Sequence, residues 1–489
     1  MKKLLAVLLT LSILFSLAAC ANGSGDAGES SKAPPSSAGQ TPAEELPAET
    51  EPEIKDDLPE ADYGGADVTI WGDTFEYDVF YNADLTGDVV NDAVFNRNNA
   101  VSDRFNVRLT YNLDASKWRN QQELINTVSA GSGAYDLALG VCCYLSTSAL
   151  AGCFRNLNKM DYVDLDRPWY MQFVNDNIQL GDKLMFAAGF FDMPSMARTL
   201  VTFYSADLAE QYGIGNLYDT VREGKWTFDY MMQVSEAVLT DLDGNGQYDE
   251  KDRYGITSQW DCIGFLYPSS GYSYVTFGED GSLSATVPTE NVYEDNALLY
   301  KLLYNADYYY SGYDKGGPHN YDNMRIAFTS GRALFFLNQL FYAQKDDMRE
   351  MGSYGILTPP KFREEQERYG SVSSVFVTGI PIDAPDPDRS AVLMEALEYQ
   401  SWKDVKPAYY DIALSQKYVN DPESAEMLDI VFDNVHCDFS YVYSGALNST
   451  DISLSVGLNE NYASWFEKQN KAMNKMLGKM MEKVAKLGD

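Results

Sequence analysis

Apolar and polar positions in the first part of the globular chain switch between two periodicities. Residues 67–71 have the composition of a buried strand, residues 107–113 alternate as a strand does, and residues 135–141 are strand-like again. A helical pattern opens after Asp88, and a second one spans residues 121–128. This alternation of strands and helices predicts an α/β lobe with a largely parallel sheet.

The ends of these strands are the first candidate binding site. In open α/β sheets, ligands bind outside the carboxyl ends of the strands. Trp71 and Asp73 follow the first strand, and Tyr144 follows the third. We therefore expect these side chains to face a common cleft.

The remainder of the chain continues to alternate between predicted helices and strands. Thr227 is placed to cap a helix that runs to Leu239. Further strands are predicted at 332–337, 354–357 and 372–380, followed by a helix at 389–401. The chain then ends in one amphipathic helix.

The terminal helix has an apolar and a basic face. Its inner face is predicted to hold Trp465, Phe466, Met473, Met476, Met480 and Val484. Its outer face repeats lysine every four residues, at Lys471, Lys475, Lys479 and Lys483. We favour a solvated face that complements the helix dipole over a face that contacts a membrane.

The N-terminus predicts export. Lys2 and Lys3 precede an apolar stretch at residues 4–17, which is too short for a comfortable membrane span. Small residues then lead to Cys20. The segment resembles a bacterial lipoprotein signal, which implies cleavage after residue 19 and lipid attachment to Cys20; an ordinary secretory signal with an incidental cysteine is the alternative.

Residues 20–62 are predicted to form a disordered acidic tether. They are rich in Gly, Ser, Pro, Ala and Glu and lack apolar periodicity. Such a segment cannot bury enough apolar surface to offset its ordering entropy. We interpret it as a spacer that holds a globular body away from a membrane.

Composition limits the possible partners. The formal net charge of −35 repels nucleic acid and anionic headgroups, and it favours neutral or cationic ligands and divalent metals. Roughly 425 residues remain after the tether, enough for two or three domains. Cysteine says little: Cys142 or Cys143 can be proposed to pair with Cys153, but buried free thiols are favoured.

A twelve-residue segment follows the calcium-loop pattern of EF-hands. Oxygen ligands fall at loop positions 1, 3 and 5, Gly246 supplies the turn at position 6, and Asp249 occupies position 9. Position 12 departs from the usual Glu. The predicted ligands of a structural Ca²⁺ are Asp241, Asp243, Asn245, Gln247 through its carbonyl, and Asp252. The alternative is an acidic surface turn.

The order of motifs resembles one protein family. In order, these are VVNDAVFNRNNAVSDRFNV, AYDLAL, FRNLN, VDLDRPW, KWTFD, SGRALFF, YGILTPPKF and LMEALEYQSW. Together they resemble the carbohydrate-type solute-binding lipoproteins of bacterial ABC importers. The resemblance implies a two-lobed, type II periplasmic-binding-protein-like α/β fold whose hinge has several crossings. By analogy, lobe 1 covers 64–195 plus 360–378, and lobe 2 covers 200–355 plus 382–489.

The resemblance also implies a partner and a place. The partner is a pair of membrane permease subunits, the place is the outer face of a Gram-positive cell membrane, and the receptor is a monomer that carries a sugar. Sugar sites combine aromatic platforms with planar polar side chains. The candidates at predicted cleft-facing ends are Trp71, Asp73, Tyr144, Tyr204, Trp260 and Asn338, of which Trp71 is the strongest.

A hydrolase is the competing class. Paired carboxylates can always be proposed in so acidic a chain, so they carry no weight. With only His319 and His436 in the chain, a histidine-based triad or zinc site is disfavoured. We therefore expect a binding protein without catalytic residues, with a surface glycoside hydrolase, a binder of another solute or a structural surface lipoprotein as alternatives.

Overall fold

The computed structural model describes most of the chain beyond residue 53. The described residues are 54–72, 80–114, 121–192, 194–259, 262, 267–311, 322–351, 353–409, 422–447, 457 and 459–488. Lys55–Asp489 form one compact unit. The predicted signal segment, Cys20, Asp73 and Trp260 lie outside the described residues.

The first sheet has the strand order β12-β3-β1-β2. Its strands β1 (Ala66–Gly72), β2 (Val107–Leu113) and β3 (Leu137–Val141) are parallel, and β12 (Phe376–Gly379) runs antiparallel to β3. The helices that follow the parallel strands are α1 (Val89–Phe105), α2 (Gln122–Ser129) and α3 (Cys142–Leu150). The parallel α/β arrangement predicted from periodicity is confirmed.

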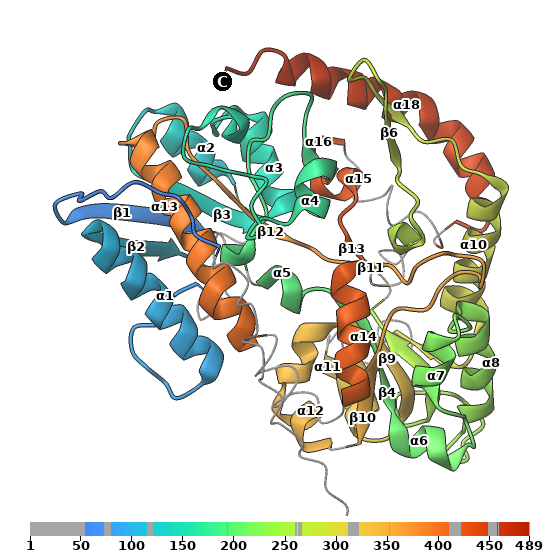
Figure 1. The fold of residues 1–489 in the computed structure, drawn as a ribbon. Coiled ribbons are helices and arrows are strands. Elements are labelled where there is room, and N and C mark those ends of the chain that lie inside the picture. The colour runs from blue at the N-terminus through green and yellow to red at the C-terminus, as the bar shows by residue number, and fades with distance from the viewer. Residues whose placement is uncertain are drawn as a thin grey trace, which may run out of the picture. The chain divides into compact units, whose positions relative to one another are not determined.

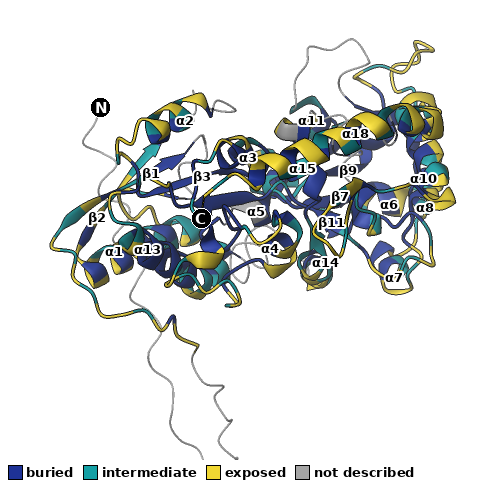
Figure 2. Cartoon of the chain, turned by 90° about the horizontal axis from the view of Figure 1, so that it is seen from above, coloured by how far each residue is buried: buried dark blue, intermediate teal, exposed yellow. Residues whose placement is uncertain are grey.

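The second sheet has the strand order β10-β4-β9-β5-β8. It mixes antiparallel pairs, β10 with β4 and β4 with β9, and parallel pairs, β5 with β8 and with β9. Its strands are β4 (Leu200–Ser205), β5 (Tyr254–Ser258), β8 (Tyr309–Tyr310), β9 (Ala333–Gln339) and β10 (Tyr354–Leu357). Figure 2 shows the strands of both sheets among the most buried parts of the chain.

Helices and short elements surround the second sheet. They are α6 (Ala206–Gln211), α7 (Leu217–Arg222), α8 (Phe228–Val238), η5 (Tyr267–Ser270), β6 (Val275–Phe277), β7 (Leu283–Ala285), α10 (Glu290–Tyr300), η6 (Lys301–Asn305), α11 (Asp322–Thr329), η7 (Leu340–Gln344) and α12 (Asp346–Met351). The predicted cap is confirmed: the Thr227 hydroxyl accepts from Tyr230 N, at 3.2 Å.

The chain passes between the two sheets more than once. The first passage runs through η3 (Leu157–Lys159), α4 (Gln172–Ile178), η4 (Phe190–Asp192) and α5 (Pro194–Ala197) into β4. The second runs through β11 (Ser371–Val372) into β12. The two passages meet where Thr199 bridges Ser373. The chain therefore forms two lobes and crosses between them more than once, so that each lobe is built from separate stretches of sequence.

The segment from α13 (Pro387–Gln400) to η8 (Ser401–Val405) packs against the first lobe, although the order of motifs predicts it in the second. The helix α13 contacts α1 of the first lobe (Figure 1). The π-helical turn η8 also contacts α1. Conversely, the backbone of Lys361 pairs with Trp226 and Phe228 beside the second sheet. The observed lobes thus exchange these pieces relative to the predicted boundaries at 360–378 and 382–489.

The rest of the C-terminal part connects both lobes. It comprises α14 (Pro422–Asp433), β13 (Val435–His436), α15 (Phe439–Val442), α16 (Ser444–Leu447) and α18 (Tyr462–Val484). The terminal helix α18 contacts β7 and α10 as well as α3 and α16. Its lysines at 471, 475, 479 and 483 are exposed, as predicted, while Leu477 takes the buried place predicted for Met476.

The tether prediction is wrong for its last residues. Asp56 is buried and pairs with the Arg104 guanidinium, and Leu58 packs against the core of the first lobe. Asp62 accepts from the side chain of Asn106, at 2.7 Å. Asp57 also pairs with Arg167, at 2.6 Å, so several contacts hold a segment whose composition alone predicts disorder. Among the described residues, no helix combines the length and apolar character needed to span a bilayer.

Candidate functional site

A cavity of about 810 Å³ lies beside the segments that cross between the sheets. The first lobe contributes α4, η4 and η8, and the second contributes α14 with the adjoining Val435. The lining residues are Met171, Phe173, Phe190, Met196, Thr199, Ser373, Val375, Trp402, Lys403, Lys406, Pro407, Asp429, Phe432, Asp433 and Val435. Residues more than 200 positions apart in the chain thus share one wall.

Aromatic rings form much of the apolar wall. Trp402 is half-buried, and its ring centroid lies 6.0 Å from that of Trp169 behind it. Phe190 and Phe432 are also half-buried, so part of each ring remains accessible. Flat apolar rings of this kind can stack against the apolar face of a ring-shaped ligand.

Charged groups of both signs stand among these rings. The Lys406 ammonium lies 4.8 Å from the centroid of the Phe190 ring. Lys403, on η8, also lines the cavity. Asp429 and Asp433 lie one turn apart on α14, and burial together with the Asp433 charge raises the pKa of Asp429. Such groups supply donors and acceptors for a hydroxyl-rich ligand.

None of the four described sugar-site candidates lines this cavity. Trp71 is fully buried in β1, between Asn112 of β2 and Ala138 of β3 in the strand register, and its indole N–H finds no acceptor among the described residues. Tyr144 is half-buried on α3. Tyr204 is buried edge-on to Tyr218, with ring centroids 5.5 Å apart.

Asn338 is fully buried near the end of β9. Its carbonyl oxygen accepts from Gln339 N, at 2.8 Å, while its amide nitrogen has no acceptor among the described residues. The structure therefore does not bring these four candidates together. The motif LMEALEYQSW contained Trp402 of the observed cavity, but only the fold shows which end of the helix faces a cavity.

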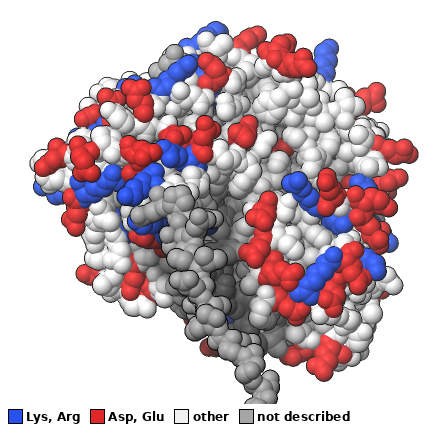
Figure 3. Space-filling model, viewed as in Figure 1, with Lys and Arg blue, Asp and Glu red and all other residues white. Residues whose placement is uncertain are grey.

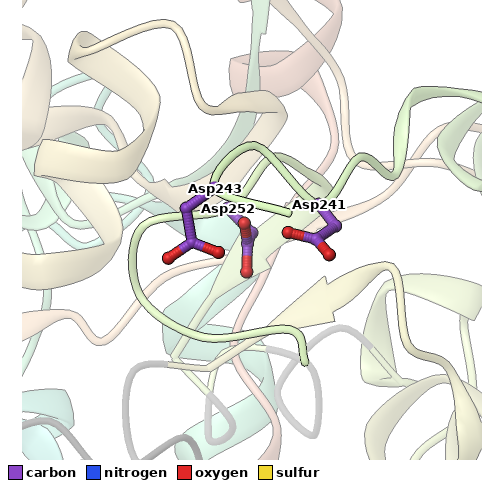
Figure 4. Close-up of side chains that lie close together, drawn as sticks. All are labelled: Asp241, Asp243 and Asp252. Carbon is purple, nitrogen blue, oxygen red and sulfur yellow. The ribbon is translucent and has the colours of Figure 1, made fainter. Parts of the chain in front are cut away.

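The predicted calcium loop has its acidic side chains directed toward one point. Asp241, Asp243 and Asp252 each place one carboxylate oxygen within 4.8 Å of the others (Figure 4). The loop turns at Gly244 and Gly246, whose φ values of 72° and 79° suit glycine.

Backbone N–H groups hold these carboxylates in place. Asp241 accepts from Gly244 N at 2.7 Å and from Gly246 N at 2.8 Å, and these bonds lower its pKa. Asp252 is fully buried and accepts from Leu242 N and Asp249 N, each at 2.8 Å. The arrangement holds the three carboxyl groups close together. Hard oxygen ligands in this arrangement fit Ca²⁺.

The five cysteines of the described chain are buried free thiols, as favoured from the sequence. Of the two histidines, His319 lies outside the described residues. Burial lowers the pKa of His436, which sits on the crossing strand β13.

No family model matches the chain, and no curated protein matches it. Solved structures do. The GacH receptor of Streptomyces glaucescens, determined unliganded and with acarbose, has a TM-score of 0.53 and 14% identity over 87% of this chain and 100% of its own.

Two further solved structures also resemble this chain in fold. An ABC substrate-binding protein of Listeria monocytogenes in complex with cycloalternan has a TM-score of 0.55 and 12% identity, covering 85% of this chain and 99% of its own. The galacto-N-biose-/lacto-N-biose I-binding protein of Bifidobacterium longum has a TM-score of 0.54 and 13% identity, covering 87% and 97%. The chain therefore has the two-lobed, type II periplasmic-binding-protein-like fold of ABC-transporter sugar-binding proteins, as the order of its motifs predicts.

Proposed function

We propose that this protein is a sugar receptor that captures a saccharide in the cavity between η8 and α14 and delivers it to an ABC permease. The observation that carries the proposal is the cavity itself, with aromatic rings and charged groups at the crossing segments of a sugar-receptor fold. A ligand that contacts both lobes favours the arrangement in which they approach each other. The neighbours in fold are binding proteins, so we assign no catalytic residue.

The ligand class is tested by a binding screen. Calorimetric titration with acarbose, cycloalternan and lacto-N-biose samples the sugars held by the neighbours in fold. We expect at least one saccharide of this screen, or of a wider panel of oligosaccharides, to bind without being hydrolysed. Release of new reducing ends by the purified protein would contradict the assignment.

The site is tested by Trp402→Ala. We expect the best saccharide to bind about tenfold or more weakly, on the order of 1.4 kcal/mol, because the variant removes the stacking surface. Trp465→Ala is the matched control, since Trp465 is a half-buried tryptophan of α18 outside the cavity lining. An unchanged affinity in Trp402→Ala, or an equal loss in both variants, would place the sugar elsewhere.

We further propose a structural Ca²⁺ in the loop at 241–252. The three converging carboxylates and the backbone bonds that orient them support this proposal. The predicted ligands Asn245 and Gln247 fall in the same turn, where the side-chain Oδ1 of Asn245 accepts from Gln247 N, at 2.7 Å. The ion would join the end of α8 to the start of β5 and neutralise the cluster.

We also propose that the protein is exported and anchored by a lipid on Cys20. The motif at residues 17–20 and the low apolar content of the residues after it support this proposal. Retention beside a permease raises the effective concentration of the receptor there.

A further inference from the structure

A second cavity lies on the second lobe, where α10 meets the first turn of α18 (Figure 1). Its volume is about 380 Å³, within the range of sites that hold small molecules. Its described lining residues are Tyr293, Asn296, Glu460, Asn461, Tyr462 and Ala463. None of these six residues lines the larger cavity between η8 and α14, so the two cavities are separate.

The Tyr462 side chain brings an unused polar group to this second cavity. Tyr462 is 2% exposed and belongs to the apolar core of the second lobe, yet its hydroxyl has no hydrogen-bond partner among the described residues. Buried hydroxyls normally have a partner, because leaving one unpaired costs free energy. Since Tyr462 lines the cavity, a molecule bound there can supply the missing partner.

Aromatic rings hold this side chain and add an apolar surface. The Trp465 ring stacks against Tyr462, with centroids 5.3 Å apart and an interplanar angle of 18°. The Tyr293 ring of α10 is tilted by 55° to that of Tyr462, with centroids 6.3 Å apart. Tyr293 is half-buried, so part of its ring is accessible for stacking.

Two asparagines shape the polar side of the cavity. Asn296 is 1% exposed; its Nδ2 donates to Asn459 O and its Oδ1 accepts from Gly457 N, each at 2.8 Å, which fixes the backbone that leads into α18. Asn461 caps α18 with its Oδ1, which accepts from Ser464 N at 3.0 Å. The amide nitrogen of Asn461 has no partner among the described residues and is left as a donor.

The lining limits the chemical class of the ligand. Glu460 is exposed and is the one charged residue of the described lining, so an anion is disfavoured there. A cation suits the carboxylate and the rings but offers no acceptor to the Asn461 amide. A hydroxyl both donates and accepts, so the hydroxyls of a neutral sugar ring can satisfy the phenol, the amide and the carboxylate together.

We propose that this cavity is a second saccharide site, in which a sugar ring packs on Tyr293 and forms hydrogen bonds with the side chains of Tyr462, Glu460 and Asn461. The site shares a ligand class with the proposed function but no residue with the larger cavity, so either site can exist without the other. A saccharide held on the second lobe raises the concentration of sugar beside the larger cavity.

The test follows Trp465 by fluorine NMR in protein labelled with 5-fluorotryptophan, with Trp465→Phe to identify its signal. Trp465 stacks on Tyr462 but lines neither cavity, so it reports on the site without being one of the proposed contacts. The probes are acarbose, cycloalternan and lacto-N-biose. We expect at least one of them to shift the Trp465 signal to saturation, and to do so equally in the wild type and in Trp402→Ala.

Variants assign the response to the second cavity. Tyr462→Phe keeps the ring and removes the unpaired hydroxyl, so the probe should bind about fivefold more weakly at this site. Tyr81→Phe is the matched control, because it removes the hydroxyl of an exposed tyrosine in the first lobe and should leave the response unchanged.

Three results would overturn the inference. If no probe shifts the Trp465 signal of the wild type, the cavity holds only water. If the response disappears in Trp402→Ala, it comes from the larger cavity, and the proposed function stands while the second site falls. If Tyr462→Phe binds the probe as tightly as the wild type does, the Tyr462 hydroxyl makes no contact with the sugar.

Discussion

At the scale of single residues, the ion pair of Arg389 and Asp136 shows what burial does to a charge. Arg389 Nη2 donates to Asp136 Oδ1 at 2.7 Å, and the two side chains are 13% and 4% exposed. The other carboxylate oxygen accepts from Thr69 N, at 2.9 Å. The pair thus joins α13 to both β1 and the start of β3.

Arg389→Ala should destabilise the protein by about 3–5 kcal/mol, because it leaves the Asp136 carboxylate buried without its cation. The measurement is denaturant unfolding at neutral pH. The matched control is Arg108→Ala: Arg108 pairs with Asp67 at 2.7 Å, but the side chains are 69% and 67% exposed, so we expect a much smaller loss of stability than in Arg389→Ala. Equal losses would show that the buried pair has no special role.

At the scale of elements, a metal ion bound in the loop between α8 and β5 would raise the stability of the folded protein. Its three carboxylates lie within 4.8 Å of one another and repel when no cation is present. Binding to the folded state alone stabilises it by about 2.7 kcal/mol when the free ion is at 100 times its dissociation constant. A chelator should therefore lower the melting temperature, and added Ca²⁺ should restore it.

Asp241→Ala should remove the effect of the chelator. The control is Asp280→Ala, which changes an exposed turn carboxylate that accepts from Ser282 N, at 3.0 Å, and lies outside the cluster. The chelator should act on this control as it does on the wild type. Identical melting of the wild type with and without Ca²⁺ would leave an acidic turn with no resident ion.

Local elements could be predicted because their signals are local. The strand at residues 354–357 coincides with β10, and Thr227 caps α8 through its own hydroxyl. Each signal depends on a few adjacent residues: β-branched and aromatic composition for the strand, and one side-chain oxygen for the cap. Packing reinforces these preferences instead of opposing them.

The binding cavity could not be predicted in the same way. Trp71 ends a strand beside a glycine and an acid, yet neighbouring strands flank it and its side chain is buried in the core. Trp402 lies in η8, directly after α13, in a segment that the predicted boundaries place in the other lobe. Which tryptophan faces the cavity depends on contacts between α13 and α1, nearly 300 residues apart, and no local pattern encodes these contacts.

At the scale of the whole molecule, charge and attachment belong together. Acidic and basic side chains are interspersed over α7 and α14 in Figure 3, where Arg222 pairs with Asp219, Glu423 and Glu426. The chain as a whole still carries a formal charge of −35. A molecule of that charge is repelled by anionic membranes, so retention at a cell surface requires something other than general electrostatic attraction.

Cys20→Ala should release the protein into the medium while leaving the sugar affinity of the purified protein unchanged. The chain between Cys20 and the first fixed contact at Asp56 spans at most about 120 Å, so a lipid on Cys20 would hold the body within that reach of the membrane. The measurement is fractionation of cells that express either form, followed by a wash at high salt. Retention of Cys20→Ala that high salt reverses would assign the attachment to exposed lysines such as those of α18, because ionic contacts are screened whereas a lipid anchor is not.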